Sequence, residues 1–145
     1  MFYSLEENKA IVRKVVEALN NGDLALLDEF VAPDFIDHAH RTRNLEEYKQ
    51  YIIMVRKGFP DYNETIEDII AEGDKVWVRY KFTGTHKGEY RRLAPTGKKV
   101  TFTAVAVWRI VEGKIVEKES ALYNVLDFYK QLGVIEYKGF PDEVK

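Results

Sequence analysis

The hydrophobic pattern of this 145-residue chain changes its period near Tyr62, and this change constrains the fold more than any other feature. Before Tyr62, apolar residues recur at the spacing of amphipathic helices. After Tyr62 they alternate, as in strands that turn one face to a core. Helices followed by strands predict an α+β fold, with the helices covering one face of a mostly antiparallel sheet.

Capping signals predict where the helices lie. Ser4 with Glu7, and Asn44 with Glu47, both have the spacing of a capping box. Asn21-Gly22 has the composition of a helix end. The expected helices span residues 4–20, 23–30 and 44–57, and a last short helix is expected over 127–132.

Four strands are expected after Tyr62, over residues 65–70, 75–86, 100–111 and 115–124. The segment 31–38 is expected to be irregular or a brief strand. On the strand 75–86, Val76, Val78 and Tyr80 share one face, which is taken as inward. The strand 100–111 is apolar on both faces, which is typical of a strand covered on both sides. Because the helices cover one face only, a homodimer packed through the sheet is expected.

Charge and composition exclude several classes of partner. The chain has 22 Lys and Arg against 24 Asp and Glu, so it offers no basic footprint for nucleic acid or an anionic membrane. It has no Cys, which excludes disulfides and thiolate metal sites. The absence of a long apolar run and of a signal peptide predicts a single cytoplasmic domain over residues 1–145.

Aromatic residues are numerous for a small core: 9 Tyr, 8 Phe and 2 Trp. Several fall on one face of two adjoining strands or at helical spacing on the third helix. This placement predicts a pocket for a small hydrophobic molecule, with plain core packing as the alternative. The expected pocket residues are Tyr51, Met54, Tyr80, Phe82, Phe102 and Trp108.

Five short motifs occur in a fixed order: Phe59-Pro60-Asp61, Gly84-Thr85-His86-Lys87-Gly88-Glu89-Tyr90, Ala94-Pro95-Thr96-Gly97-Lys98, Gly113-Lys114-Ile115-Val116-Glu117 and Gln131-Leu132-Gly133. With them the chain resembles the SnoaL-like polyketide cyclase family, also called ester cyclases, of the nuclear transport factor 2-like (NTF2-like) superfamily. The resemblance runs from about Ser4 to Gly133. It implies a cone in which a curved sheet wraps three helices around a deep apolar pocket, usually in a homodimer packed through the sheet.

The resemblance also implies chemistry, and here the sequence departs from the family. Family members close a polyketide ring by intramolecular aldol condensation without a cofactor, using an Asp near the end of the last strand. Counting back from Gln131 reaches Asn124, whereas counting forward from Glu117 reaches Tyr123. Neither is a carboxylate, so the family's base is not carried over. Tyr123 is instead expected to contact the ligand, together with Phe59 of the first motif.

His38 and His86 are the remaining candidates for acid–base work, because an imidazole titrates near neutral pH. His38 matches a His that recurs in the family before the third helix and is expected to face the pocket; the alternative is a structural His that holds a loop. His86 lies on the inward face at a strand end, where it belongs equally to a turn. Asp37 is expected to be solvated or to cap a loop. The three His, at 38, 40 and 86, have no metal-ligand spacing.

Two classes of function remain open. The first is a cofactor-independent enzyme acting on a small hydrophobic carbonyl or ring compound, with His38 as acid or base and Tyr80 or Asn124 as donors to an oxyanion. The second is a non-catalytic protein that holds an apolar metabolite in the same pocket. A pocket with a hydrogen-bonded His38 and a second polar group beside it would favour the enzyme, whereas a wall of rings and aliphatic chains alone would favour the binder.

Overall fold

A computed structural model describes residues 3–136, 138 and 140, and it confirms the α+β prediction. Helices lie at both ends of the chain and between the first two strands. In chain order the elements are α1 (Leu5–Asn21), a 3-10 turn η1 (Leu24–Leu26), α2 (Leu27–Phe30), β1 (Val31–Asp37), α3 (Leu45–Gly58), β2 (Asn63–Glu72), β3 (Lys75–Thr85), β4 (Lys99–Val111), β5 (Lys114–Leu122) and α4 (Val125–Leu132).

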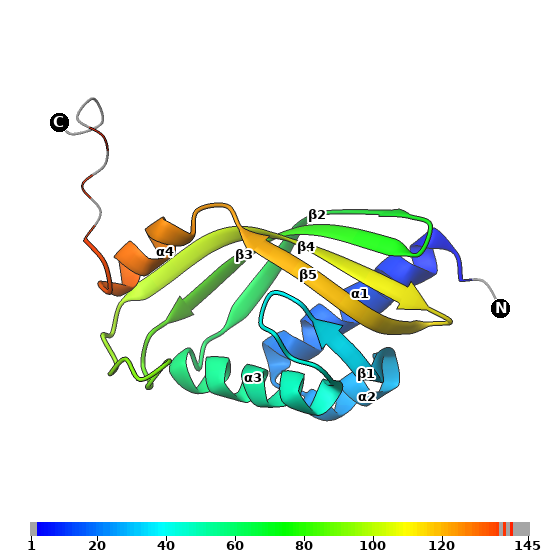
Figure 1. Cartoon of the computed structure of the whole chain (residues 1–145), viewed down its shortest axis with the longest axis horizontal. Coiled ribbons are helices and arrows are strands. Elements are labelled where there is room, and N and C mark those ends of the chain that lie inside the picture. The colour runs from blue at the N-terminus through cyan, green and yellow to red at the C-terminus, as the bar shows by residue number, and fades with distance from the viewer. Residues whose placement is uncertain (1–2, 137, 139, 141–145) are drawn as a thin grey trace.

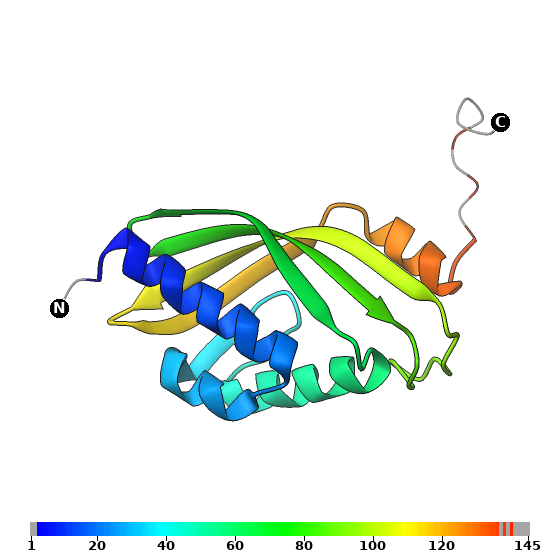
Figure 2. The same cartoon turned by 180° about the vertical axis from the view of Figure 1, so that it is seen from behind.

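The strands form one curved, open sheet in the order β1-β5-β4-β3-β2. β1 pairs parallel with β5, and the other neighbours are antiparallel. The segment 31–38 is therefore mostly an edge strand, because β5 supplies its hydrogen-bonding partner. Figures 1 and 2 show α1 and α3 beneath the sheet, on its concave side, and α4 at one end of it.

Local signals place the first and third helices where the sequence predicts them. Ser4 and Glu7 form the complete capping box, each side chain bonding the other's backbone N–H. Asn44 caps α3 by accepting a hydrogen bond from the backbone of Glu47 at 2.8 Å. The Glu47 side chain turns instead to Arg43, whose guanidinium lies 2.6 Å away. Caps of this kind stabilise a helix by about 1 kcal/mol each.

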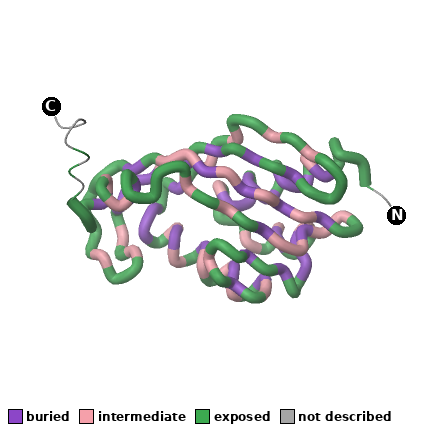
Figure 3. Tube along the Cα trace, turned by 45° about the horizontal axis from the view of Figure 1, so that its top comes forward, coloured by how far each residue is buried: buried purple, intermediate pink, exposed green. Residues whose placement is uncertain are grey.

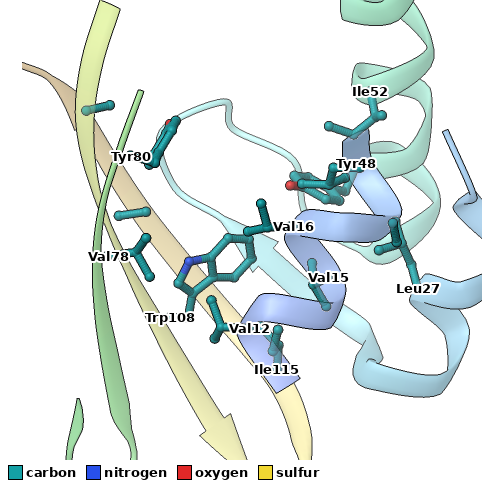
Figure 4. Packing of buried hydrophobic residues seen from close by; sticks show 14 of the residues in the cluster. Val12, Val15, Val16, Leu27, Tyr48, Ile52, Val78, Tyr80, Trp108 and Ile115 are labelled. Carbon is teal, nitrogen blue, oxygen red and sulfur yellow. The ribbon is translucent and has the colours of Figure 1, made fainter. Parts of the chain in front are cut away.

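The core lies between α1 and the concave face of the sheet. Val12, Val15 and Val16 of α1 face Val78 and other inward residues of the strands, as Figure 4 shows. The inward set predicted on β3 is buried in full, from Val76 through Phe82. Among the described residues, no helix is long and apolar enough to cross a membrane.

Two β-bulges change which side chains face the core. In β5, Val116 is the extra residue, because Arg109 pairs with Glu117 while Ile110 pairs with Ile115. Ile115 and Lys118 are therefore both buried, and Glu117 between them points out. A similar shift in β2, at Glu67, lets Ile66 and Ile69 both pack against the core. A bulge reverses the alternation of a strand, so the inward set beyond it cannot be read from parity.

Candidate functional site

A cavity of about 860 Å³ opens between α3, the concave face of the sheet and α4. This volume lies within the range of small-molecule sites. Ten of its 23 lining residues are Phe or Tyr, and a few others are ionisable. The lining residues are Ala39, His40, Arg41, Tyr48, Tyr51, Ile52, Met54, Val55, Phe59, Tyr62, Glu64, Tyr80, Phe82, Tyr90, Arg91, Phe102, Lys118, Ser120, Ala121, Leu122, Val125, Phe128 and Tyr129.

Six of the eight residues expected to contact a ligand lie in this wall: Tyr51, Met54, Phe59, Tyr80, Phe82 and Phe102. Trp108 does not, contrary to expectation. Its ring is buried in the core against α1, because its position on β4 lies opposite Val12 and Val16 (Figure 4). Tyr123 is also outside the wall and is 63% exposed, in the link between β5 and α4.

One residue of the wall, His40, pairs with the buried Asp37, a pair that the sequence did not predict. His40 lines the cavity, and its Nδ1 lies 2.6 Å from Oδ2 of Asp37. The His40 ring stacks on Tyr51, with centroids 4.1 Å apart. Burial raises the pKa of Asp37, but the hydrogen bond from His40 and the charge of Lys118 outweigh burial and lower it. The ionised Asp37 then accepts the Nδ1–H, which leaves Nε2 as the free nitrogen of the ring.

A tight turn brings His40 back to Asp37. The backbone of Asp37 pairs with that of Thr42, and Arg41 adopts a left-handed φ of 57°. The Asp37 carboxylate also accepts from the backbone N–H of Ala39 at 3.1 Å. Asp37 therefore caps the loop, as one of its two expected roles, but it is fully buried and not solvated. Strand parity does not apply within this turn, which is why the pair escaped prediction.

His38 lies outside the cavity, contrary to expectation. Its side chain is 45% exposed, and Nε2 is 2.8 Å from Oε2 of Glu117. Arg109 holds the other oxygen of that carboxylate at 2.6 Å. His38 follows the inward Asp37 directly, so the alternation of β1 directs it to the outer face. This placement matches the alternative of a structural His.

A buried lysine enters the cavity beside the Asp–His pair. Lys118 of β5 is the register partner of Asp37 on one side and of Trp108 on the other, and it is 4% exposed. Its Nζ lies 4.6 Å from the ring centroid of Trp108 and 5.7 Å from that of Tyr48. Burial lowers the pKa of Lys118, but the nearby Asp37, Tyr80 and Glu64 outweigh burial and raise it. The side chain is therefore a cation in the cavity wall.

A carboxyl group lines the cavity directly from the other edge strand of the sheet. Glu64 of β2 lines the wall and accepts a short hydrogen bond from the hydroxyl of Tyr62. Burial raises the pKa of Glu64 more than Lys118, Tyr62 and His40 lower it. The expected strand began at Thr65, so Glu64 was missed, although it stands two residues before the inward Ile66.

The remaining candidates lie outside the wall. Asn124 is exposed and caps α4, where its side chain accepts from the backbone of Asp127 at 3.0 Å. His86 is fully buried behind Phe59, and its Nδ1 accepts the backbone N–H of Thr96 at 3.2 Å. The described residues include no cluster of three His, Cys, Asp or Glu that could hold a metal ion.

Comparison with known proteins finds similarity over most of the chain. The family model described as SnoaL-like polyketide cyclase matches residues 9–132. The aklanonic acid methyl ester cyclase DauD of Streptomyces sp. (strain C5) is 30% identical over 130 residues, which cover 85% of this chain and 80% of DauD. The nogalonic acid methyl ester cyclase of Streptomyces nogalater is 27% identical over 107 residues, covering 70% of this chain and 79% of that protein.

Solved structures share the fold. AclR of Streptomyces galilaeus, proposed to be a hydroxylase, superposes with a TM-score of 0.81 at 29% identity, covering 92% of this chain and 85% of AclR. IdmH of Streptomyces antibioticus, proposed to be a polyketide cyclase, gives a TM-score of 0.75 at 31% identity, covering 87% of this chain and 98% of IdmH. The curved sheet and the helices on its concave side match the cone expected of an NTF2-like protein.

Proposed function

The chain belongs to the SnoaL-like polyketide cyclase family, and from this premise we propose that it closes a ring in a hydrophobic, polyketide-like carbonyl compound by an intramolecular aldol reaction. The proposal needs no cofactor, because proton transfers alone drive the reaction. The observation that carries it is that His40, in the wall of a cavity large enough for such a compound, is joined at 2.6 Å to the buried Asp37.

The residues of the wall fit the steps of this reaction. His40 Nε2 takes a proton from a carbon next to a carbonyl, and Asp37 holds the ring in the correct tautomer. The electron pair of that C–H bond forms an enolate, whose carbon attacks a ketone carbon elsewhere in the same molecule. The resulting alkoxide takes the proton back from His40. Atoms and charges balance, and the product is an isomer of the substrate.

The apolar wall explains how one compound folds into a reactive shape. Rings from α3, β3, β4 and α4 surround the ligand: Tyr51, Phe59, Phe82, Phe102 and Phe128. A confining aromatic wall holds two carbons of a flexible chain within reach, and such positioning contributes a large share of intramolecular rate enhancement.

A second candidate function is a non-catalytic binder of an apolar metabolite. It is favoured by one observation: Tyr123 and Asn124, where the family's Asp is expected, carry no carboxylate and lie outside the cavity wall. A binder needs the aromatic wall but not the Asp37–His40 pair.

Turnover of aklanonic acid methyl ester, the compound for which the relatives are named, tests the proposal. We expect His40→Ala to lower kcat by about 100- to 10,000-fold, the usual contribution of a general base. Asp37→Asn should also lower kcat, by up to about 10,000-fold, because an amide in place of the carboxylate leaves the His40 ring in the wrong tautomer. His38→Ala is the matched control on the outer face and should keep kcat within about twofold.

Product formation is followed by chromatography and mass spectrometry, and binding by fluorescence quenching. A wild-type protein that binds the ester but never cyclises it favours the binder. Equal rates in the wild type and His40→Ala would remove His40 from the mechanism.

A further inference from the structure

Lys118 has no hydrogen-bonding partner for its ammonium group among the described residues, although it is 4% exposed and lines the cavity. In the part of the chain that the structure describes, the ammonium of Lys118 forms no salt bridge, unlike the side chains of His38, His40 and Arg109. The rings of Trp108 and Tyr48 flank the ammonium and hold it by cation–π attraction. Its three N–H donors remain available to a ligand.

Tyr48 presents a second donor at the same place. Its hydroxyl is buried and has no hydrogen-bonding partner in the part of the chain that the structure describes. Figure 4 shows this hydroxyl directed from α3 toward the strands that carry Tyr80 and Trp108. Burial, together with the charges of Asp37 and Glu64, raises the pKa of Tyr48. The phenol therefore keeps its proton and acts as a donor.

A buried polar group without a partner costs free energy, so the Tyr48 hydroxyl calls for an acceptor, and the Lys118 ammonium 5.7 Å from the same ring can donate to that acceptor too. Both side chains belong to the cavity wall, and a ligand in the cavity can supply the acceptor. Resting on the proposed function, we propose that Lys118 Nζ and Tyr48 Oη bind one carbonyl oxygen of the ligand and stabilise the negative charge that it gains when its neighbouring carbon is deprotonated.

The charges in the cavity fit this arrangement. Before proton transfer, Lys118 and Asp37 carry opposite charges on neighbouring strands, and the raised pKa of Glu64 favours its neutral form. Transfer of the proton from carbon to His40 creates an imidazolium beside Asp37 and an enolate beside Lys118. The new imidazolium and the enolate then each lie near an existing opposite charge, and neither Lys118 nor Tyr48 gives up its proton. Fixed donors of this kind stabilise an oxyanion because they need no reorganisation.

The donor pair defines the class of ligand that the site selects. The ligand carries a carbonyl or ionisable enol oxygen next to an acidic carbon, attached to an apolar body that fills the aromatic wall. A purely hydrocarbon ligand leaves both donors unpaired and is disfavoured by the cost of those buried groups.

Binding of 2-naphthol tests the inference without turnover. Naphtholate resembles a planar enolate, and its absorbance distinguishes it from neutral naphthol. The full-length wild type should bind naphtholate about tenfold more tightly than naphthol, measured as a downward shift of the apparent pKa of the bound probe. Lys118→Met should abolish this preference, and Tyr48→Phe should reduce it about threefold while keeping the ring packed on Phe35.

Lys81→Met is the control, because Lys81 is exposed on the opposite face of the sheet, and it should keep the wild-type preference. A wild type without preference for naphtholate, or variants that keep it, would overturn the inference. Circular dichroism checks the fold of each variant, and Tyr48→Phe still decides the question if Lys118→Met does not fold.

The outcome separates this inference from the proposed function. If the wild type binds naphtholate preferentially but does not cyclise the ester, and Lys118→Met loses the preference, the oxyanion site is supported and the cyclase function is contradicted. If Lys118→Met keeps the naphtholate preference while turnover depends on His40, the cyclase function is supported and the oxyanion site is contradicted.

Discussion

Glu64 is a carboxylic acid of the cavity wall whose pKa is raised by burial. Its carboxyl group accepts from Tyr62, and Lys118 and His40 lie close enough to lower its pKa in part. Burial outweighs them, so the folded-state pKa lies above the unfolded value. Folded Glu64 then keeps its proton over a pH range in which the unfolded chain has released it, and stability falls as pH rises through that range.

Replacing this carboxyl group by an amide should remove the loss of stability that accompanies the rise in pH. We expect Glu64→Gln to raise the melting temperature by a few degrees at neutral pH, and to have its smallest effect near pH 4, close to the ordinary Glu value. Gln keeps an acceptor for Tyr62. Thermal unfolding by circular dichroism between about pH 4 and pH 8 measures the difference, and the opposite contribution of Asp37 is common to both proteins.

Glu67→Gln supplies the control, because Glu67 is exposed at the bulge of the same strand. A gain in Glu64→Gln that does not depend on pH would contradict the assigned cause.

At the scale of elements, two of the motifs that resemble the family, Phe59-Pro60-Asp61 and residues 84–90, join the end of α3 to the loop between β3 and β4. Asp61 accepts from the backbone of Thr85 at 2.6 Å and from its hydroxyl at 2.7 Å. The backbone N–H groups of Lys87 and Gly88 donate to Gly58, at 3.0 and 3.1 Å. The same loop continues to Tyr90 in the cavity wall. The motifs therefore position one side of the cavity.

Gly88 makes the closest approach within this joint. A Cβ at that position would lie 2.0 Å from the carbonyl oxygen of Lys57, a backbone atom that cannot move without shifting α3. We expect Gly88→Ala to lower the free energy of unfolding by about 3 kcal/mol, the upper range for overpacking, as measured by urea unfolding.

Gly97→Ala, in the same loop, separates the steric effect from backbone strain. Gly97 has a left-handed φ of 72° but no atom within 4 Å of a Cβ. Gly97→Ala should therefore lower the free energy of unfolding by only about 1 kcal/mol. A Gly88→Ala protein no less stable than Gly97→Ala would contradict the prediction, because it would show that the backbone around Gly88 can shift at little cost.

At the scale of the whole molecule, the convex face of the sheet presents an apolar row. Ile70, Trp77 and Val107 are register partners on three adjacent strands, and Ile70 and Trp77 are 60% and 46% exposed. Figure 3 shows exposed and buried residues alternating along these strands. An apolar row on an uncovered face is typical of an interface between proteins. The homodimer expected from the two-sided apolar strand stays a prediction, and this row is where we place it.

Charging the centre of this row should separate the protomers. We expect the wild type to sediment as a dimer, and Trp77→Lys to weaken dimerisation at least about a hundredfold, since an unpaired buried charge costs several kcal/mol. Sedimentation velocity should then give the mass of one chain, 16.9 kDa. Ile53→Lys, on the exposed side of α3, is the control and should remain dimeric. A monomeric wild type would contradict the prediction.

The sequence was most informative where structure depends on neighbours along the chain. The caps at Ser4 and Asn44 depend on a few adjacent residues, and both helices begin where these residues predict. Alternation on β3 is unbroken, so its inward residues were predicted correctly. The order of the motifs was sufficient to identify the family.

Only the tertiary structure decided which ionisable groups enter the cavity. The bulge at Val116 turns Lys118 inward, the turn at Arg41 returns His40 to Asp37, and pairing with β5 makes β1 an edge strand. The bulge and the edge strand depend on pairing between residues far apart in the chain, whereas the turn depends on the left-handed backbone of Arg41. One inserted residue reverses the face that every later side chain takes. Local periodicity therefore determined the cone and its aromatic wall, and long-range register determined the chemistry inside it.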